Sequence, residues 1–351
     1  MKTFKKFLSI LIIALLSFSF AFPNKAMAQI NPFNPFREVP IKIAVVMYDV
    51  NEPYPSQIVK YLQVIQEENK DKVQFTFFNS NNNENLETQF INSIISNEQY
   101  NLILLDLVNI NSVENVINRI KSSNIPVIVF HSEPYNMDAI KSYNKAIFIG
   151  SSPEEGGILQ GEILINEWIK HKNTVDHNKN NVMEYILLKG KPNSLDTIGR
   201  SKASVSTIDA AGIKTKELSS VICNWDKEEG RKATEALLLQ FGDKIEVINS
   251  NNDSMAIGAI EALQSYGFNK EGSSRTIPVV GVDGLPEAIE LIDKGIMTNT
   301  VIQDAKGTAE ALFYCGMNLA ENKKPLEGTN YTFDDSGVAI RIPYMLYKAL
   351  N

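Results

Sequence analysis

The sequence predicts an α/β fold made of two doubly wound parallel sheets, each forming one lobe. Short, almost continuously apolar segments alternate with longer amphipathic ones, as expected for parallel strands that helices cover on both faces. The same alternation starts again near residue 156, which indicates a second sheet. The length of 351 residues also exceeds what one hydrophobic core usually supports.

The first series of elements begins after residue 40. The segments IKIAVVM at Ile41–Met47 and IPVIVF at Ile125–Phe130 show the apolar continuity of buried strands. We expect strands at Ile41–Met47, Val73–Phe78, Asn101–Leu107, Ile125–Phe130 and Ala146–Ile149. Amphipathic segments between them predict helices at Ser56–Gln66, Leu86–Ser96 and Ser112–Ser122.

The second series repeats this pattern as far as residue 320. Helices are expected at Gly156–Ile169, Ser201–Ala211, Lys227–Gln240, Ser254–Ser265, Glu287–Asp293 and Thr308–Ala320. Strands are expected at Glu184–Leu188, Glu217–Val221, Ile245–Asn249, Ile277–Val282 and Asn299–Ile302. Ligands of such sheets bind outside the carboxyl ends of the strands, so functional residues are expected there.

The first 28 residues have the pattern of a secretory signal peptide. Lysines in Met1–Phe7 precede an uncharged apolar run at Leu8–Phe22, and Ala26 and Ala28 supply the small residues that a signal peptidase recognises. We expect cleavage before Gln29, a loose leader at 29–40, and a periplasmic or otherwise extracytoplasmic protein. The alternative is that the apolar run is retained as an N-terminal membrane anchor.

The charge balance limits the partners. The chain carries 41 Asp and Glu against 34 Lys and Arg, a formal net charge of −7. An acidic chain does not neutralise phosphates, so we expect no nucleic-acid partner. The sequence also lacks the glycine-rich nucleotide-binding fingerprints and the G-x-S-x-G elbow of hydrolases.

Polar residues follow most of the predicted strands. They are rich in Asn, Asp and Gln, and include Glu52, His131, Ser194, Asp196, Asn252, Asp283 and Gln303. The aromatic residues Tyr54 and Trp225 lie near them in the sequence pattern. Amides and carboxylates pair with vicinal hydroxyls, and a flat ring covers the C–H face of a pyranose. This combination predicts a neutral, polyhydroxylated ligand.

A separate loop has the pattern of a calcium site. Asp176, Asn178, Asn180 and Glu184 supply side-chain oxygens at loop positions 1, 3, 5 and 9, and Val182 supplies its carbonyl at position 7. Asn181 stands where such a loop turns through positive φ, which Asn tolerates. Position 12 is Leu187, so a further carboxylate would have to come from elsewhere.

The chain resembles the galactose/glucose-binding proteins, the type I periplasmic sugar-binding proteins of ABC importers. The resemblance runs from about Ile41 to Tyr344 and rests on ordered segments, among them VFHSEP at 129–134, IFIGSSPEEGGILQGE at 147–162, SNNDSMAIGAIEAL at 250–263 and VVGVDGLPEA at 279–288. It implies two lobes joined by a three-strand hinge, a sugar in the cleft between them, and closure on binding. It places one lobe at 41–150 plus 303–337 and the other, with the calcium loop, at 151–302 plus 338–351.

The resemblance also implies individual roles. By it, Asp196 and Arg200 bind the anomeric hydroxyl and the ring oxygen, Trp225 and Tyr54 stack on the ring, and Asn252 and Asp283 bind ring hydroxyls. The chain departs from the family pattern at Glu52, His131, Ser194 and Gln303, mostly where the family reads the 4-hydroxyl and the 6-hydroxymethyl group. A monosaccharide is therefore expected, and another hexose or a pentose stays open. The resemblance supplies Glu246 as the missing ligand of a structural Ca²⁺.

These observations predict a monomeric binding protein, and not an enzyme, that delivers a monosaccharide to a membrane ABC permease. The alternative is a sensor whose loaded form docks on a membrane chemoreceptor or a sensor kinase. An enzyme acting on a sugar is a third class. A sugar-responsive repressor would need an N-terminal helix-turn-helix and a basic surface, and this chain has neither feature.

Overall fold

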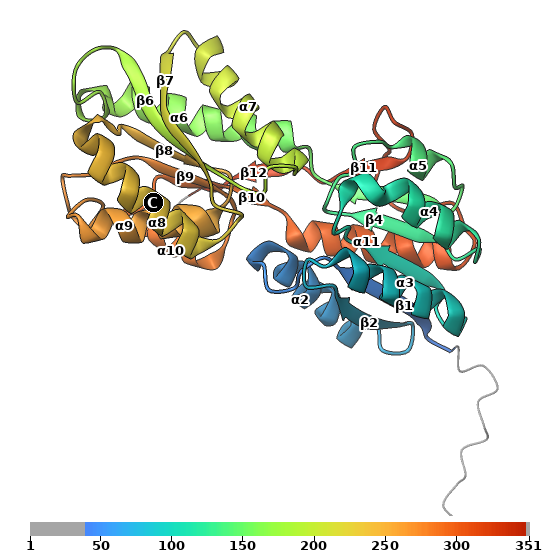
Figure 1. The fold of residues 1–351 in the computed structure, drawn as a ribbon. Coiled ribbons are helices and arrows are strands. Elements are labelled where there is room, and N and C mark those ends of the chain that lie inside the picture. Colours follow the sequence, from blue (N-terminus) through green and yellow to red (C-terminus); the bar gives the residue numbers. More distant parts are fainter. Residues whose placement is uncertain (1–38, 349–351) are drawn as a thin grey trace, which may run out of the picture. The chain divides into compact units, whose positions relative to one another are not determined.

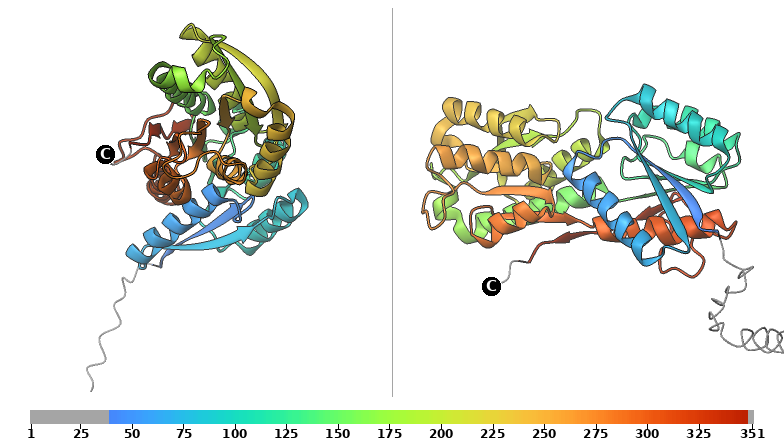
Figure 2. Two further views of the ribbon diagram at one scale, coloured as in Figure 1. Left: turned by 90° about the vertical axis from the view of Figure 1, so that its left-hand side faces the viewer. Right: turned by 90° about the horizontal axis from the view of Figure 1, so that it is seen from below.

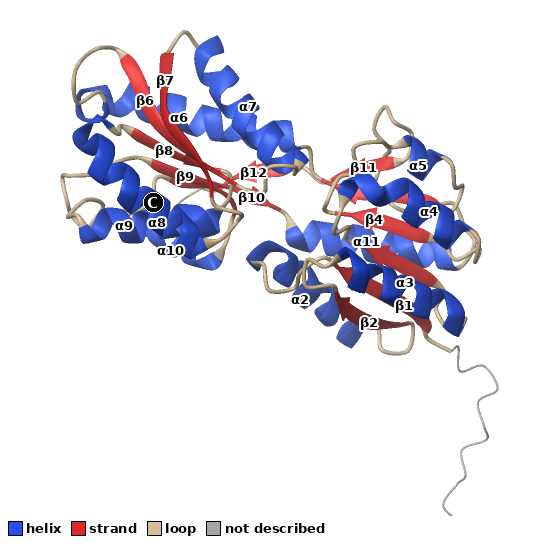
Figure 3. Ribbon diagram, in the orientation of Figure 1, coloured by secondary structure: helices blue, strands red, loops and turns tan. Residues whose placement is uncertain are grey.

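Two six-stranded sheets organise the protein in this computed structural model, which describes residues 39–348 (Figures 1 and 3). The predicted signal peptide and residues 29–38 of the leader lie outside the described residues. The strand orders are β11-β5-β4-β3-β1-β2 and β12-β10-β9-β8-β6-β7. Every pairing is parallel except that of β10 with β12. The predicted α/β fold with two parallel-sheet lobes is confirmed.

The first lobe is built on the first sheet. Its strands are β1 (Ile41–Met47), β2 (Val73–Asn79), β3 (Leu102–Leu105), β4 (Val127–Phe130), β5 (Ala146–Gly150) and β11 (Ala339–Arg341). Its helices are α2 (Pro53–Glu68), α3 (Glu84–Asn97), α4 (Val113–Lys121), α5 (Asp138–Lys141) and α11 (Ala305–Ala320), with a 3₁₀ turn, η2, at Ile110–Ser112. Alternate residues of β1 face opposite cores: Val45 packs with α2 and α11, and Val46 packs with α3 and α4. Figure 2 shows α2 and α11, far apart in sequence, side by side on one face of the sheet.

The second lobe repeats this arrangement. Its strands are β6 (Val182–Lys189), β7 (Lys214–Ile222), β8 (Val247–Ser250), β9 (Val279–Asp283), β10 (Asn299–Gln303) and β12 (Tyr344–Leu346). Its helices are α6 (Pro153–Val175), α7 (Leu195–Ala210), α8 (Lys227–Phe241), α9 (Asp253–Ser265) and α10 (Pro286–Asp293), with the 3₁₀ turn η3 at Gly242–Lys244. Ile186 and Leu188 of β6 face a core formed with α8, α9 and α10, whereas Met183 and Leu187 face the core under α6 and α7. Helices therefore cover both faces of this sheet as well.

The chain passes between the two sheets at three places. They lie after β5, after β10 and between β11 and β12, so the last crossing falls at 342–343. The prediction that this crossing lies at 337–338 is wrong. Gly337, at a φ of 76°, closes a turn with the carbonyl of Asp334, and Ala339 then pairs with Phe148 in the first sheet. The assignment of 338–341 to the second lobe is corrected accordingly.

Each strand and helix predicted from the sequence corresponds to an element of the structure. The short α5, β11 and β12 were not predicted, because three or four residues carry no periodicity. Within residues 39–348, no helix combines the length and the apolar character needed to cross a membrane, although α6 has 23 residues.

Candidate functional site

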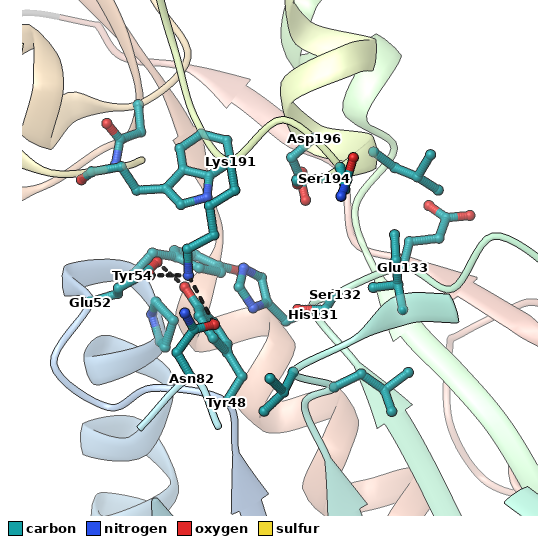
Figure 4. Close-up of a pocket in the computed structure, with 18 of the residues that line it drawn as sticks. Tyr48, Glu52, Tyr54, Asn82, His131, Ser132, Glu133, Lys191, Ser194 and Asp196 are labelled. Carbon is teal, nitrogen blue, oxygen red and sulfur yellow. Dashed lines mark hydrogen bonds and ion pairs between the residues drawn. The ribbon is translucent and has the colours of Figure 1, made fainter. Parts of the chain in front are cut away.

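A cavity of about 400 Å³ opens at the carboxyl ends of strands from both sheets (Figure 4). Its size suits a small molecule. All the residues that the sequence and the resemblance assign to a ligand line it, and they are Glu52, Tyr54, His131, Ser194, Asp196, Arg200, Trp225, Asn252, Asp283 and Gln303. The structure thus brings the predicted set together in one place, while their individual roles stay predictions.

The fold explains why these residues converge. Asp283 and Gln303 are the last residues of β9 and β10, and His131 directly follows β4. Asn252 caps α9 immediately after β8, where its Oδ1 accepts a hydrogen bond from the Met255 amide. Each side chain therefore sits at the point where a parallel strand gives way to a loop or helix, which is the ligand position of such sheets.

Arg200 is the centre of the polar network on the second lobe. Its Nη2 donates to Asp196 Oδ1 at 2.9 Å, to Gln303 Oε1 at 2.9 Å and to the Tyr344 hydroxyl at 2.8 Å. Burial opposes the charge of Arg200, but Tyr344, Asp196 and Asp283 together raise its pKa. Its Nε is buried and has no partner among the described residues.

His131 is held by the first lobe in one orientation. Its backbone has a φ of 60°, and its Nδ1 lies 3.1 Å from Oδ2 of the buried Asp106. The ring also packs against Tyr48 and Tyr54, with centroids 5.9 and 5.2 Å away. Burial alone would lower the pKa of His131, but Asp106 raises it above its ordinary value. With Nδ1–H assigned to Asp106, Nε2 is the ring atom left for a ligand hydroxyl.

Trp225 forms an aromatic wall whose place depends on a glycine. A Cβ on Gly190 would lie 2.1 Å from the indole ring, so the ring packs directly on the backbone of that residue. Trp225 itself has a φ of 69°. The Arg200 guanidinium lies 5.8 Å from the centroid of the indole ring. Tyr54, also buried, contributes a second ring from the first lobe.

Sequence reasoning did not assign three residues that line one end of the cavity, and they are Tyr48, Asn82 and Lys191 (Figure 4). Lys191, from the second lobe, donates to Glu52 Oε1 at 2.9 Å and to Asn82 Oδ1 at 3.3 Å. Its ammonium also lies 4.7 Å from the centroid of the Tyr48 ring, and the Tyr48 hydroxyl bonds Glu52. The only signal in the sequence was a lysine two residues beyond β6, and its partners are supplied by the other lobe.

The charges that line the cavity are mostly balanced within the protein. Glu52 pairs with Lys191, Asp196 pairs with Arg200, and Glu133 makes two 2.7 Å bonds to Arg341. Asp283 has no ion pair within residues 39–348. Such a cavity offers many hydrogen-bond donors and acceptors but little net charge, which suits an uncharged polar ligand.

The loop at residues 176–184, where calcium is predicted, is closed by its own hydrogen bonds, and Glu246 lies beside it. Asp176 accepts hydrogen bonds from the amides of Asn180 and Asn181, at 3.0 and 3.1 Å. Glu246, fully buried, accepts from the amides of His177 and Glu184, both at 3.0 Å. Burial raises the pKa of Glu246, and the like charges of Asp176 and Glu184 add to this effect. Asn181 has the predicted positive φ, at 59°.

The fit of this loop to a metal ion is incomplete in the structure. Lys216 donates to Glu184 Oε1 at 2.5 Å, and the Asn178 amide donates to Glu184 Oε2 at 2.7 Å. Among the described residues, no three His, Cys, Asp or Glu side chains are arranged to hold a metal. The donor chemistry, hard oxygens from carboxylates, amides and a carbonyl, is still that preferred by Ca²⁺.

Comparisons with known proteins agree with this architecture. A family model described as "Periplasmic binding protein domain" matches residues 43–324. The D-galactose/methyl-galactoside binding periplasmic protein of Haemophilus influenzae is 35% identical over 260 residues, which cover 72% of this chain and 75% of that protein.

Solved structures show the same fold at lower identity. A solute-binding protein of Actinobacillus succinogenes with bound D-allose has a TM-score of 0.72 at 18% identity, covering 88% of this chain and 97% of that one. A solute-binding protein of Bacillus halodurans with bound myo-inositol has a TM-score of 0.71 at 22% identity, covering 88% and 95%. Together with its two-sheet fold, the family match shows that this chain belongs to the periplasmic binding proteins, a family of extracytoplasmic solute-binding proteins.

Proposed function

We propose that this protein binds one monosaccharide, of the hexose class, in the cavity and delivers it to a membrane ABC importer. The observation that carries the proposal is the cavity itself, in which the predicted polar and aromatic residues converge with their charges largely balanced. The 35% identity to a galactose-binding protein supports a hexose. The function proposed is binding and release, without chemical change of the sugar.

The contacts left free on these side chains match a ring of hydroxyls. The Gln303 amide nitrogen has no partner within residues 39–348, because only its oxygen meets Arg200. Asn252 uses its Oδ1 for the helix cap and its Nδ2 donates to the Trp225 carbonyl at 3.4 Å, so one amide proton is left for a ligand. Asp283 supplies an acceptor, the protonated His131 supplies a donor at Nε2, and Trp225 supplies a flat apolar face. Bidentate pairs of this kind suit vicinal hydroxyls.

Titration calorimetry against galactose, glucose, allose, ribose, arabinose and myo-inositol tests this function. We expect a micromolar Kd for at least one hexose, about −8 kcal/mol, and a weaker response to pentoses. The sugar should be recovered unchanged. If a folded sample binds none of these compounds, the proposed function is wrong.

Tryptophan fluorescence provides a matched control within the same chain. The sequence has two tryptophans: Trp225 lines the cavity, whereas Trp168 lies in the α6 core. We expect Trp168→Phe to keep the fluorescence change on sugar addition and Trp225→Phe to lose it. The reverse result would place the ligand elsewhere.

We also propose a structural Ca²⁺ in the loop that joins α6 to β6. Asp176, Asn178, Asn180, Glu184, Glu246 and the Val182 carbonyl would hold it. The loop conformation and the buried Glu246 beside it support this assignment, whereas Lys216 on Glu184 must turn away for the ion to bind. Lys216 has a side chain that is 59% exposed, so it has solvent to move into.

Membership of the family implies an extracytoplasmic location, and the way in which the chain is exported is a proposal. We infer that residues 1–28 are a cleaved signal peptide and that the mature protein is a monomer. Mass spectrometry of protein recovered from outside the cytoplasmic membrane should give a chain that begins at Gln29. A full-length chain in the membrane fraction would instead indicate a retained anchor.

A further inference from the structure

Asp253, the first residue of α9, is a buried carboxyl outside the set that lines the cavity. It is 0% exposed. Its Oδ1 accepts a hydrogen bond from Thr300 Oγ1 at 2.6 Å, and its Oδ2 accepts from the Leu285 amide at 2.8 Å. The side chain therefore ties the start of α9 to β10 and to the turn that follows β9.

The turn bound by Asp253 carries a cavity residue in an unusual conformation. Asp283 has a φ of 127°, and Gly284 follows at 75°. Few residues other than glycine adopt such a φ, so the surrounding contacts must hold it. The Leu285 amide, two residues after Asp283, is the group that Asp253 fixes. The backbone that directs Asp283 toward the cavity is thus anchored from behind by Asp253.

Space for this anchor is left by a glycine in β9. A Cβ on Gly281 would lie 2.2 Å from Asp253 Oδ1. The carboxyl group is therefore packed against the backbone of the strand that ends in Asp283. Any side chain at residue 281 would displace it.

The two carboxyl groups also influence each other electrostatically. Burial raises the pKa of Asp253 to about 7 and that of Asp283 well above its ordinary value. The charged groups that act on Asp283 are Arg200 and His131, which favour its ionisation, and Asp253 and Asp196, which oppose it. The hydroxyls of Tyr54 and Tyr344 belong to the same buried environment.

We propose that Asp253 is a positioning residue for ligand recognition: it fixes the turn that aims Asp283 at the ligand and governs the charge that Asp283 carries. This rests on the proposed function, because Asp283 acts here as an acceptor for a sugar hydroxyl. A purely structural role would lower stability and leave the chemistry of the cavity unchanged.

The first test is the pH dependence of sugar affinity in the wild type and in Asp253→Asn. An ionised Asp283 accepts hydroxyl hydrogen bonds, so affinity should be full at high pH and fall as the pH drops through its raised pKa. Asp253→Asn removes the negative charge beside Asp283 and so lowers the pKa of Asp283. The midpoint, the pH at which half of the sugar affinity is lost, should therefore be lower in the variant. The plateau affinity should also weaken roughly tenfold, because the turn loses one acceptor.

Two further variants keep the test decisive. Thr300→Val removes one donor to Asp253 with little change of shape, and should move the midpoint in the same direction by a smaller amount. Asn269→Ala removes a buried side chain that bonds the carbonyls of Ile277 and Ile296 elsewhere in the second lobe. This control should lower the melting temperature without moving the midpoint. If Asp253→Asn does not fold, Thr300→Val carries the test.

A carboxyl titration by nuclear magnetic resonance, on ligand-free protein, separates this inference from the proposed function. Asp283 should titrate at lower pH in Asp253→Asn than in the wild type. If the wild type binds no sugar but this shift occurs, the proposed function fails and the link between Asp253 and Asp283 stands. If sugar binds and neither the titration nor the affinity midpoint moves, the inference is overturned.

Discussion

Lys191 shows how one side chain joins the two lobes at the cavity. It extends from the loop after β6, and its contacts, Glu52, Asn82 and Tyr48, all belong to the first lobe. Both members of the Lys191–Glu52 pair are partly exposed, at 30% and 21%. Solvent screening therefore limits the pair to about 1 kcal/mol or less. Because the pair joins the two lobes, we expect it to make sugar affinity depend on the approach of the lobes.

We expect Lys191→Met to weaken sugar binding a few-fold, because a contact that favours the approach of the lobes is lost. It should also reduce the loss of affinity that added salt causes, since screening acts on this pair. Lys189→Met is the matched control, because Lys189 ends the same strand and contacts Ser220 within its own lobe. Calorimetry at low and high salt measures both effects. Equal affinities for the two variants would contradict this role.

The strand pattern alone predicts ligand-facing residues only where they follow a strand, whereas Arg200 in α7 and Tyr54 in α2 were assigned by the resemblance. Asp283 and Gln303 end strands, so their position was visible from the apolar runs before them. Lys191 and Tyr48 could not be given their contacts, because these form between lobes that are far apart in the chain. Asp253 was visible as a polar residue, but its burial and its hold on Leu285 depend on the turn after β9.

At the scale of elements, the loop between α6 and β6 is where a metal ion would act. It connects a helix to the strand that runs beside β7 and β8, and Glu246 reaches it from just before β8. An ion there would pin the loop to the amino-terminal ends of β6 and β8, which are neighbours inside the second sheet. The cavity lies at the carboxyl ends of the strands, and this loop lies at the start of β6, so the effects should fall on stability alone.

We expect chelation with EDTA to lower the melting temperature, and calcium to restore it. A ligand at 100-fold excess over its Kd stabilises the folded state by about 2.7 kcal/mol. Glu246→Gln should remove most of the calcium-dependent part while leaving sugar specificity unchanged. Lys216→Met should strengthen the calcium effect, because a competing cation is lost from Glu184. If EDTA does not change the melting temperature of the wild type, the loop is only a polar turn.

The elements themselves were largely predictable, and the exceptions share a cause. Buried strands have continuous apolar runs and amphipathic helices have a clear period, as β1 and α4 respectively illustrate. The strands β11 and β12 have three residues each, and what defines them is their pairing with β5 and β10. The third crossing was therefore placed too early, at a glycine that makes a turn.

At the scale of the whole molecule, the three crossings define where the lobes join and where a closing motion would turn. Arg200 bonds the end of β10 through Gln303 and the start of β12 through Tyr344, both next to a crossing. A ligand that binds Arg200 is therefore linked through this side chain to two of the segments that join the lobes. A ligand shifts an open–closed balance only by its differential affinity for the two forms.

We expect small-angle scattering to show a smaller radius of gyration for the protein with its bound sugar than for the protein without it. Trp225→Ala should show no change at the same sugar concentration, since it removes a wall of the cavity. Both delivery to an importer and docking on a sensor require this change of shape. Equal radii with and without a sugar that calorimetry shows to bind would contradict closure.

The first lobe contains α11 and β11, which lie near the end of the sequence, and this has a consequence for how the protein is synthesised. The first core includes Ala309, Leu312 and Phe313, which a ribosome adds only after nearly all of the second sheet. A growing chain stopped at residue 302 would hold a first sheet on which α2 alone covers the face that α2 and α11 share. The first lobe can therefore complete its core only after α11 and β11 have been added. If the chain is exported unfolded, as its predicted signal peptide implies, this order of synthesis keeps the first lobe incomplete until export is nearly finished.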